Sequence, residues 1–298
     1  MNLPDRGPGI ELVSRERISA TREWIVVKAG GRDIRALVLL PDAFSADGRY
    51  PLVVALHNFD GAAEGFADLI GAERLRSRGL VVLLPQAGGV VRDWKGPGLT
   101  LLAAAMVPDG AQVNDVVVVA RVLQIAGPLY GVRFDDVNIL GFSQGATLAL
   151  ALSRRLDAER PGAVRRLFLA SGSAIAPLDQ TLALPGTDVV AYEPGHNFMQ
   201  ALADWRTAEP AERIFLQALL RLKGCEAVSH KTAGSIDRRA YTCEGGASVI
   251  HFFEAKGEHA WPGQPAKYDS WLTGRGSISA LDFTDLIADA IAPASTSP

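Results

Sequence analysis

The sequence lacks the features that mark several classes of protein. Its 298 residues include only two cysteines, Cys225 and Cys243, too few for a disulfide-rich scaffold or a cysteine-rich zinc site. The longest apolar stretch, residues 99–107, is nine residues long, about half of what a membrane-spanning helix needs. Neither sign of charge prevails, because 30 Lys+Arg stand against 33 Asp+Glu. We therefore expect neither nucleic acid nor a membrane as a partner.

The two ends of the chain also lack apolar patterning. Residues 1–17 contain no apolar segment of the kind that forms the centre of a secretory signal. We expect residues 1–20 to form an N-terminal arm and residues 293–298 a disordered tail. Between them lies no linker, repeat or low-complexity segment, and 48% of the chain is hydrophobic. The sequence therefore predicts a single globular domain over residues 21–292.

Short apolar runs alternate with helical segments along most of this domain. Residues 22–29 and 33–40 are rich in β-forming residues and are separated by two glycines, which predicts an antiparallel hairpin. Several later runs are apolar on every face and suit strands buried in a parallel sheet. The pattern predicts an α/β fold, with a mostly parallel sheet of about eight strands and helices on both faces. The further strands are expected at residues 52–56, 80–84, 137–140, 167–170, 181–184 and 247–254, and the helices at residues 62–78, 113–129, 146–155, 198–223 and 278–291.

One motif points to a chemical reaction. Residues 137–140 run directly into G-F-S-Q-G at residues 141–145 and then into a segment rich in Ala and Leu. This is G-x-S-x-G between a strand and a helix, the context in which the serine is a nucleophile. A Cβ at either glycine would clash in so sharp a turn. The N-terminus of the following helix would favour an oxyanion near Ser143. The alternative is an incidental serine in a glycine-rich turn.

A serine nucleophile needs a general base, because an unactivated hydroxyl attacks poorly. In this context the order along the chain is serine, acid, histidine. His259 follows the last predicted strand, in K-G-E-H-A-W-P-G, and is the expected base. His57 precedes the serine, His251 lies inside a strand, and His196 and His230 lie in predicted loops.

The acid that orients this histidine is expected in the loop after the seventh strand, residues 181–184. Asp188 lies four residues beyond that strand and Glu193 nine residues beyond it. We favour Asp188, with Glu193 as the alternative. A carboxylate that only caps a turn is the other interpretation of Asp188.

Two backbone N–H groups are expected to form the oxyanion hole. One is that of Gln144, next to the nucleophile. The other belongs to the loop L-H-N-F-D-G at residues 56–61, where we assign it to Phe59.

Taken together, these segments resemble the polyhydroxybutyrate depolymerase and feruloyl esterase group of the α/β-hydrolase superfamily. They are L-V-V-A-L-H-N-F-D-G, L-L-P-Q with Trp94 nearby, N-D-V before a long helix, G-F-S-Q-G-A and E-H-A-W-P-G, and they extend from about residue 35 to residue 265. The resemblance implies the α/β-hydrolase fold, with Ser143 as nucleophile and His259 as triad histidine. It also implies that Asp188 lies near the acid position, in a shortened acid loop.

The resemblance has implications for other residues as well. Similar enzymes often carry a cysteine on each side of the segment before the last strand, which implies a Cys225–Cys243 disulfide and a secreted or periplasmic location. Two unrelated buried thiols are the alternative. Trp261 matches a tryptophan that follows the family's histidine, and we expect Trp94 and Trp261 to bind substrate. Asn58 departs from the family's glycine in the oxyanion loop.

These inferences predict a serine esterase that works through an acyl-enzyme intermediate, with no metal or organic cofactor. The expected substrates are hydroxyalkanoate polyesters or oligomers, or feruloyl and acetyl esters on polysaccharide. The net charge of −3 suits an uncharged substrate. The alternatives are an amide hydrolase of a poly(amino acid) on the same triad, and an inactive binding protein on this scaffold.

Overall fold

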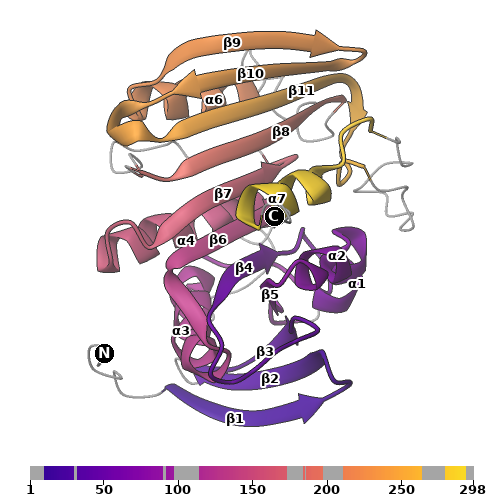
Figure 1. Cartoon of the computed structure of the whole chain (residues 1–298), viewed down its shortest axis with the longest axis vertical. Helices are drawn as coiled ribbons and strands as arrows, with labels where there is room; N and C mark the ends of the chain where they lie inside the picture. The colour runs from indigo at the N-terminus through magenta and orange to yellow at the C-terminus, as the bar shows by residue number, and fades with distance from the viewer. Residues whose placement is uncertain are drawn as a thin grey trace, which may run out of the picture.

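The computed structural model describes residues 10–29, 32–89, 92–96, 114–172, 184, 186–196, 211–263 and 279–292. Eleven strands from these residues form one sheet in the order β1-β2-β3-β5-β4-β6-β7-β8-β11-β10-β9 (Figure 1). The strands are β1 (Ile10–Arg17), β2 (Arg22–Ala29), β3 (Arg32–Leu39), β4 (Tyr50–Leu56), β5 (Val81–Pro85), β6 (Val132–Phe142), β7 (Val164–Ala170), β8 (Asp188–His196), β9 (Glu226–Ala233), β10 (Ile236–Thr242) and β11 (Ser248–Glu258).

The centre of the sheet is parallel and its two sides are antiparallel. Strands β5, β4, β6, β7, β8 and β11 all run in one direction. The hairpin β2–β3 joins β5 antiparallel, and the hairpin β9–β10 joins β11 antiparallel. The predicted N-terminal hairpin is confirmed, and the predicted parallel arrangement holds for the central strands. The whole sheet is mixed, because five of its ten strand pairings are antiparallel. Because the six central strands point the same way, their C-terminal ends meet at one end of the sheet, which we call the carboxyl end.

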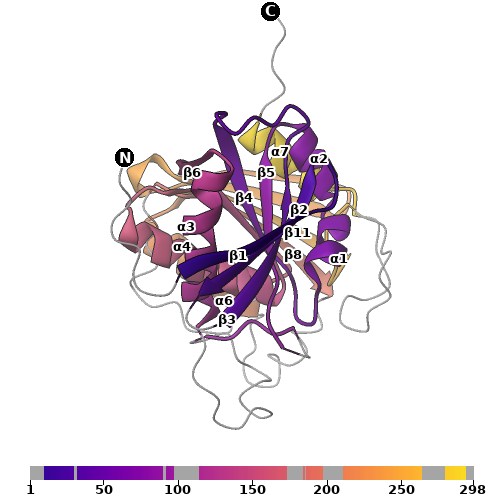
Figure 2. The ribbon, with the colours of Figure 1, turned by 90° about the horizontal axis from the view of Figure 1, so that it is seen from below.

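Helices cover both faces of the sheet (Figure 2). Helices α3, α4 and α6 pack on one face and α1, α2 and α7 on the other, each over its own apolar core. In β4, Leu52 and Val54 point into the first core and Val53 and Ala55 into the second, all at most 1% exposed. Burial on both sides explains why this strand is a continuous apolar run in the sequence. The helices are α1 (Ala63–Leu69), α2 (Ala72–Ser77), α3 (Asp115–Leu129), α4 (Gln144–Glu159), α6 (Ala211–Leu222) and α7 (Phe283–Ile291). None of the helices in these residue ranges is long and apolar enough to cross a membrane.

The sheet is larger than the sequence predicted. Strand β1 lies within the expected N-terminal arm, and β9 and β10 lie between the two cysteines. Six of the eight residues of β1 and seven of the eight of β9 are exposed. A strand at the edge of a sheet that is exposed on both faces needs no apolar run, so a search for apolar runs misses it.

The seventh strand begins later in the chain than predicted. It is β8, which covers Asp188–His196, whereas Leu184 belongs to no strand and residues 181–183 lie outside the described residues. A Pro-Gly pair on each side of V-V-A-Y suggested a loop at this place. The segment is instead a strand because β7 and β11 pair with its backbone on both sides, and the two cores bury its apolar side chains.

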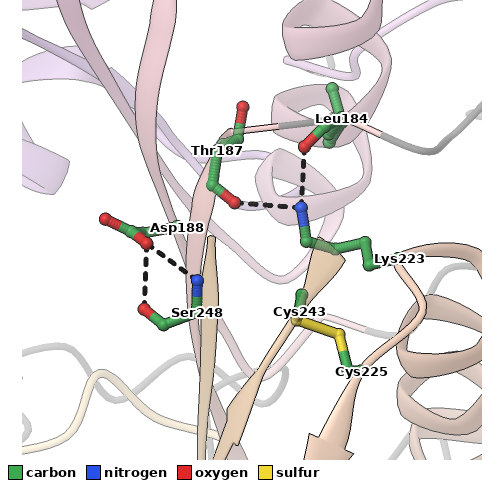
Figure 3. Close-up of a disulfide and its surroundings, with 7 residues drawn as sticks. All are labelled: Leu184, Thr187, Asp188, Lys223, Cys225, Cys243 and Ser248. Carbon is green, nitrogen blue, oxygen red and sulfur yellow. Dashed lines mark hydrogen bonds between the residues drawn. A yellow bond between two sulfur atoms is a disulfide. The ribbon is translucent and has the colours of Figure 1, made fainter. Parts of the chain in front are cut away.

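A disulfide closes the base of the β9–β10 hairpin. It joins Cys225, directly before β9, to Cys243, directly after β10, which confirms the pairing that the family resemblance implied. Beside it, the buried Nζ of Lys223 donates hydrogen bonds to the backbone carbonyls of Leu184 at 2.7 Å and Thr187 at 3.0 Å (Figure 3). These bonds tie the end of α6 to the start of β8, at the end of the sheet opposite the carboxyl end.

Candidate active site

Ser143 occupies a strained turn between β6 and α4. Strand β6 ends at Phe142 and α4 begins at Gln144, so Ser143 is the residue directly before the helix. Its φ is 55° and its ψ is −122°, a conformation that residues with a side chain rarely adopt. The turn therefore places the hydroxyl at the carboxyl end of the sheet and at the N-terminus of α4.

The two glycines of the motif make this turn possible. A Cβ on Gly145 would lie 2.0 Å from the carbonyl oxygen of Leu56, and one on Gly141 would lie 2.2 Å from the carbonyl oxygen of Gly145. Both contacts are with backbone atoms, so a side chain at either position would displace the turn. The steric reason inferred from the sequence is confirmed. The contact with Leu56 also shows that the first turn of α4 lies against the end of β4.

His259 follows β11 directly and reaches Ser143. Its Nε2 lies 3.0 Å from Ser143 Oγ, although the two residues are 116 positions apart. They meet because β6 and β11 are parallel strands of one sheet and end on the same side. Burial lowers the pKa of His259 to about 4. The imidazole is therefore neutral at pH 7 and able to accept a proton from the serine.

Asp188 lies at the wrong end of β8 to orient this histidine. It is the first residue of the strand, whereas the carboxyl end lies at His196. Its Oδ1 accepts hydrogen bonds from the backbone N–H and the hydroxyl of Ser248, both at 2.9 Å (Figure 3). Ser248 begins β11 and His259 follows its last residue, so the two sites lie at opposite ends of that strand. The prediction that Asp188 is the triad acid is wrong, because it rested on a strand placed too early in the chain.

Glu193, the alternative acid, has a different partner. Its Oε2 lies 2.9 Å from His251 Nε2, and both side chains are buried. Within the described residues, no hydrogen-bond acceptor meets the buried Nδ1 of His259. Burial is the cause of the lowered pKa of His259, and no carboxylate of the described residues raises it. This part of the chain thus holds a serine–histidine pair without a carboxylate bound to it, and no group of three His, Cys, Asp or Glu side chains placed to hold a metal.

The loop after β4 carries Phe59, the expected oxyanion donor. Strands β4 and β6 are parallel neighbours with Leu56 opposite Gly141, so this loop and the nucleophile leave the sheet side by side. The N–H of Asp60 donates to the carbonyl of Arg92 at 2.9 Å. The N–H of Phe59 takes no part in the backbone hydrogen bonds of this loop.

His57, which follows β4, holds this loop in place. Its Nε2 accepts a hydrogen bond from the N–H of Ala87 at 3.0 Å, and its Nδ1 lies 2.7 Å from the carbonyl oxygen of Asn58. An Nε2 that accepts leaves the proton on Nδ1, which then donates to Asn58. Burial lowers the pKa of His57 to about 4, so the ring stays neutral and keeps this tautomer at pH 7. The ring therefore ties the loop after β4 to the residues after β5.

No protein-family model matches the sequence, and no curated protein sequence is similar to it. Among solved structures, an acetyl xylan esterase from Aspergillus awamori has a TM-score of 0.54 and 12% identity, covering 74% of this chain and 87% of that one. A glucuronoyl esterase from Solibacter usitatus has a TM-score of 0.53 and 12% identity, covering 87% of this chain and 84% of that one. The chain has the α/β-hydrolase fold.

The side chain of Gln144 holds a second loop beside Ser143. Its Oε1 accepts a hydrogen bond from the N–H of Trp94 at 3.2 Å. Its Nε2 donates to the carbonyl of Trp94 at 3.3 Å and to the carboxylate of Asp93. Further along this loop, the N–H of Lys95 donates to Asp115 Oδ2 at 2.7 Å. Asp93 belongs to no recognisable local motif, and Asp115 is marked only as the aspartate of N-D-V, to which no role was assigned.

Trp94 and Trp261 support the site from within the core. Each is 1% exposed. The ring of Trp94 stacks on that of His57, with centroids 4.5 Å apart, and its Nε1 donates to the His57 carbonyl at 2.7 Å. Trp261 packs edge-on against Phe142, and its Nε1 donates to Thr284 Oγ1 at 3.0 Å. Because this packing leaves neither ring a free surface, the structure does not support the prediction that both bind substrate.

Proposed function

We propose that the protein is a serine ester hydrolase. The observation that carries this proposal is the 3.0 Å contact between Ser143 Oγ and His259 Nε2 at the carboxyl end of the sheet. A serine on a strained strand–helix turn, with a neutral histidine in reach, has the arrangement of an activated nucleophile. The ester as the bond attacked is supported by the two similar structures, an acetyl xylan esterase and a glucuronoyl esterase.

In the proposed reaction, Ser143 Oγ attacks the ester carbonyl while His259 Nε2 takes the hydroxyl proton. The carbonyl oxygen becomes an oxyanion. We assign its stabilisation to two backbone N–H groups, that of Phe59 in the loop after β4 and that of Gln144 at the N-terminus of α4. His259 then gives the proton to the leaving alcohol, and Ser143 is left acylated. Water attacks the acyl group as His259 takes its proton, and the return of that proton to Ser143 releases the acid.

The substrates that we propose are uncharged esters, namely hydroxyalkanoate polyesters or oligomers, or feruloyl and acetyl esters on polysaccharide. A net charge of −3 on 298 residues offers no attraction for a polyanion. The Cys225–Cys243 disulfide supports an oxidising compartment, secreted or periplasmic, as the place of action.

Labelling with a fluorophosphonate probe tests the proposal. We expect covalent labelling of Ser143 and hydrolysis of p-nitrophenyl acetate, with both lost in Ser143→Ala. Ser77→Ala is the matched control, because Ser77 is exposed and its hydroxyl donates only to the backbone of its own helix. Polyester, feruloyl-sugar and anilide substrates assayed in parallel identify the bond. Turnover of the anilide alone would indicate an amide hydrolase. Neither labelling nor turnover would leave a binding protein on this scaffold.

A further inference from the structure

The side chain of Gln144 connects the nucleophile turn to the loop that carries the second oxyanion donor. We propose that Gln144 is a positioning residue, whose side-chain amide fixes the Asp93–Trp94 segment and through it the N–H of Phe59. The inference rests on the proposed function, since it concerns the oxyanion hole of that reaction. It goes beyond it because it gives the side chain, and not only the backbone N–H, of Gln144 a part in the reaction.

The first step of the connection is the amide itself. Gln144 accepts a hydrogen bond from the N–H of Trp94 and donates to the carbonyl of the same residue, at 3.2 Å and 3.3 Å. It therefore holds this backbone as a neighbouring strand would, with one donor and one acceptor. Its Nε2 also donates to the carboxylate of Asp93, which is 6% exposed. Burial raises the pKa of Asp93, so the carboxylate depends on the donors that the protein supplies.

The second step leads from this segment to the oxyanion loop. The indole Nε1 of Trp94 donates to the carbonyl of His57 at 2.7 Å. The carbonyl of Arg92 accepts the N–H of Asp60 at 2.9 Å. Trp94 thus contacts the oxyanion loop two residues before Phe59, and Arg92, directly before the Asp93–Trp94 segment, contacts it one residue after Phe59. A shift of the segment would move both contacts, and with them the N–H of Phe59.

The chemistry of the amide makes the role testable. Glutamate has the shape of glutamine but no donor when ionised, so Gln144→Glu removes both Nε2 bonds and sets a second carboxylate against Asp93. Adding Asp93→Asn returns a donor to the pair, because the asparagine amide can donate to the new carboxylate. The double variant therefore restores the link with the two groups exchanged.

The experiment measures kcat and KM for p-nitrophenyl acetate, and inhibition by an aryl trifluoromethyl ketone, whose serine adduct carries an oxyanion. For Gln144→Glu we expect kcat to fall about 100-fold with KM within about twofold, since loss of one oxyanion donor costs about 10²–10³ in rate. Ketone inhibition should weaken by a similar factor. Gln144→Glu with Asp93→Asn should recover at least about tenfold of the lost kcat. Gln124→Glu is the control, because it makes the same change on α3, where the side chain contacts Arg121.

Three results would overturn the proposal. One is a kcat of Gln144→Glu within threefold of the wild type. Another is a loss of kcat in Gln144→Glu that Asp93→Asn does not relieve. The third is a fall in kcat with unchanged ketone inhibition, which would show that the variant leaves stabilisation of the oxyanion intact. If the wild type is neither labelled by fluorophosphonate nor active on any ester, the proposed function itself fails and this role fails with it.

Discussion

Replacing both cysteines with serine should destabilise the protein and leave the ester hydrolysis that we propose unchanged. The disulfide closes a loop of 18 residues that contains the whole β9–β10 hairpin. Apart from its pairing with β10, little else holds the outer strand, since seven of the eight residues of β9 are exposed. Apolar burial, the main source of stability elsewhere in the sheet, is therefore small in this hairpin.

The expected magnitude follows from the loop length. In the chain-entropy model, a disulfide that closes a loop of this size lowers the entropy of the unfolded chain. Its removal should therefore reduce the free energy of unfolding by about 3 kcal/mol at 25 °C. The entropy of unfolding of a 298-residue chain is about 0.6 kcal/mol per degree, so the same loss lowers Tm by about 5 °C. Activity should persist because the disulfide lies beside Leu184 and Thr187, at the end of the sheet opposite Ser143.

Urea unfolding of the wild type and of Cys225→Ser with Cys243→Ser measures this difference. Dithiothreitol should lower the stability of the wild type to that of the double variant and leave the double variant unchanged. Val228→Ser is a control in the same hairpin: the side chain is 62% exposed, and its loss should cost less than about 0.5 kcal/mol. A loss below 1 kcal/mol in the double variant, or a fall in kcat/KM as large as the fall in stability, would refute this reasoning.

Three further predictions follow from the site and its supports. Asp188→Ala should cost about 1–2 kcal/mol in urea unfolding, because two hydrogen bonds from Ser248 are lost, and should leave kcat/KM for p-nitrophenyl acetate within twofold; a hundredfold loss of rate would reinstate Asp188 as the acid. The kcat/KM of the wild type should stay constant as pH falls from 7 to 5 and reach half its value near pH 4, because His259 accepts a proton only in its neutral form; an inflection near pH 6.5 would contradict the burial of that ring. Thr284→Val should lower the free energy of unfolding by about 1–3 kcal/mol, since it leaves the Nε1 of buried Trp261 without its acceptor. An unchanged urea midpoint would show that this hydrogen bond adds no stability.

The serine and the histidine that we propose as nucleophile and base are predictable from the sequence because their signals are local. G-F-S-Q-G directly follows an apolar run and precedes a helical segment. Ser143 can therefore be assigned from the adjacent residues alone. His259 required one more assumption, that the last parallel strand ends beside the serine's strand, and the sheet order of an α/β fold supplies it. The structure brings the two side chains to 3.0 Å.

The acid could not be assigned in this way, because its position depends on where a strand begins. The Pro-Gly pairs on both sides of V-V-A-Y pointed to a loop, although Val and Tyr favour strands, and pairing with β7 and β11 makes the segment strand β8. A shift of a few residues carries Asp188 from the carboxyl end of the sheet to the opposite end. Whether so short a segment forms a strand depends on neighbours that are distant in the sequence, and local composition does not reveal them.

The sequence by itself determined the class of sheet, the turn at Ser143 and the position of its histidine, because spacing along a few residues dictates strand, turn and helix. Only the tertiary structure decided the place of Asp188, the burial of Trp94 and Trp261, and the exposed strands at the two edges of the sheet. Each of these depends on which segments pack against one another. These neighbours come from distant parts of the chain, so no short segment of the sequence specifies them.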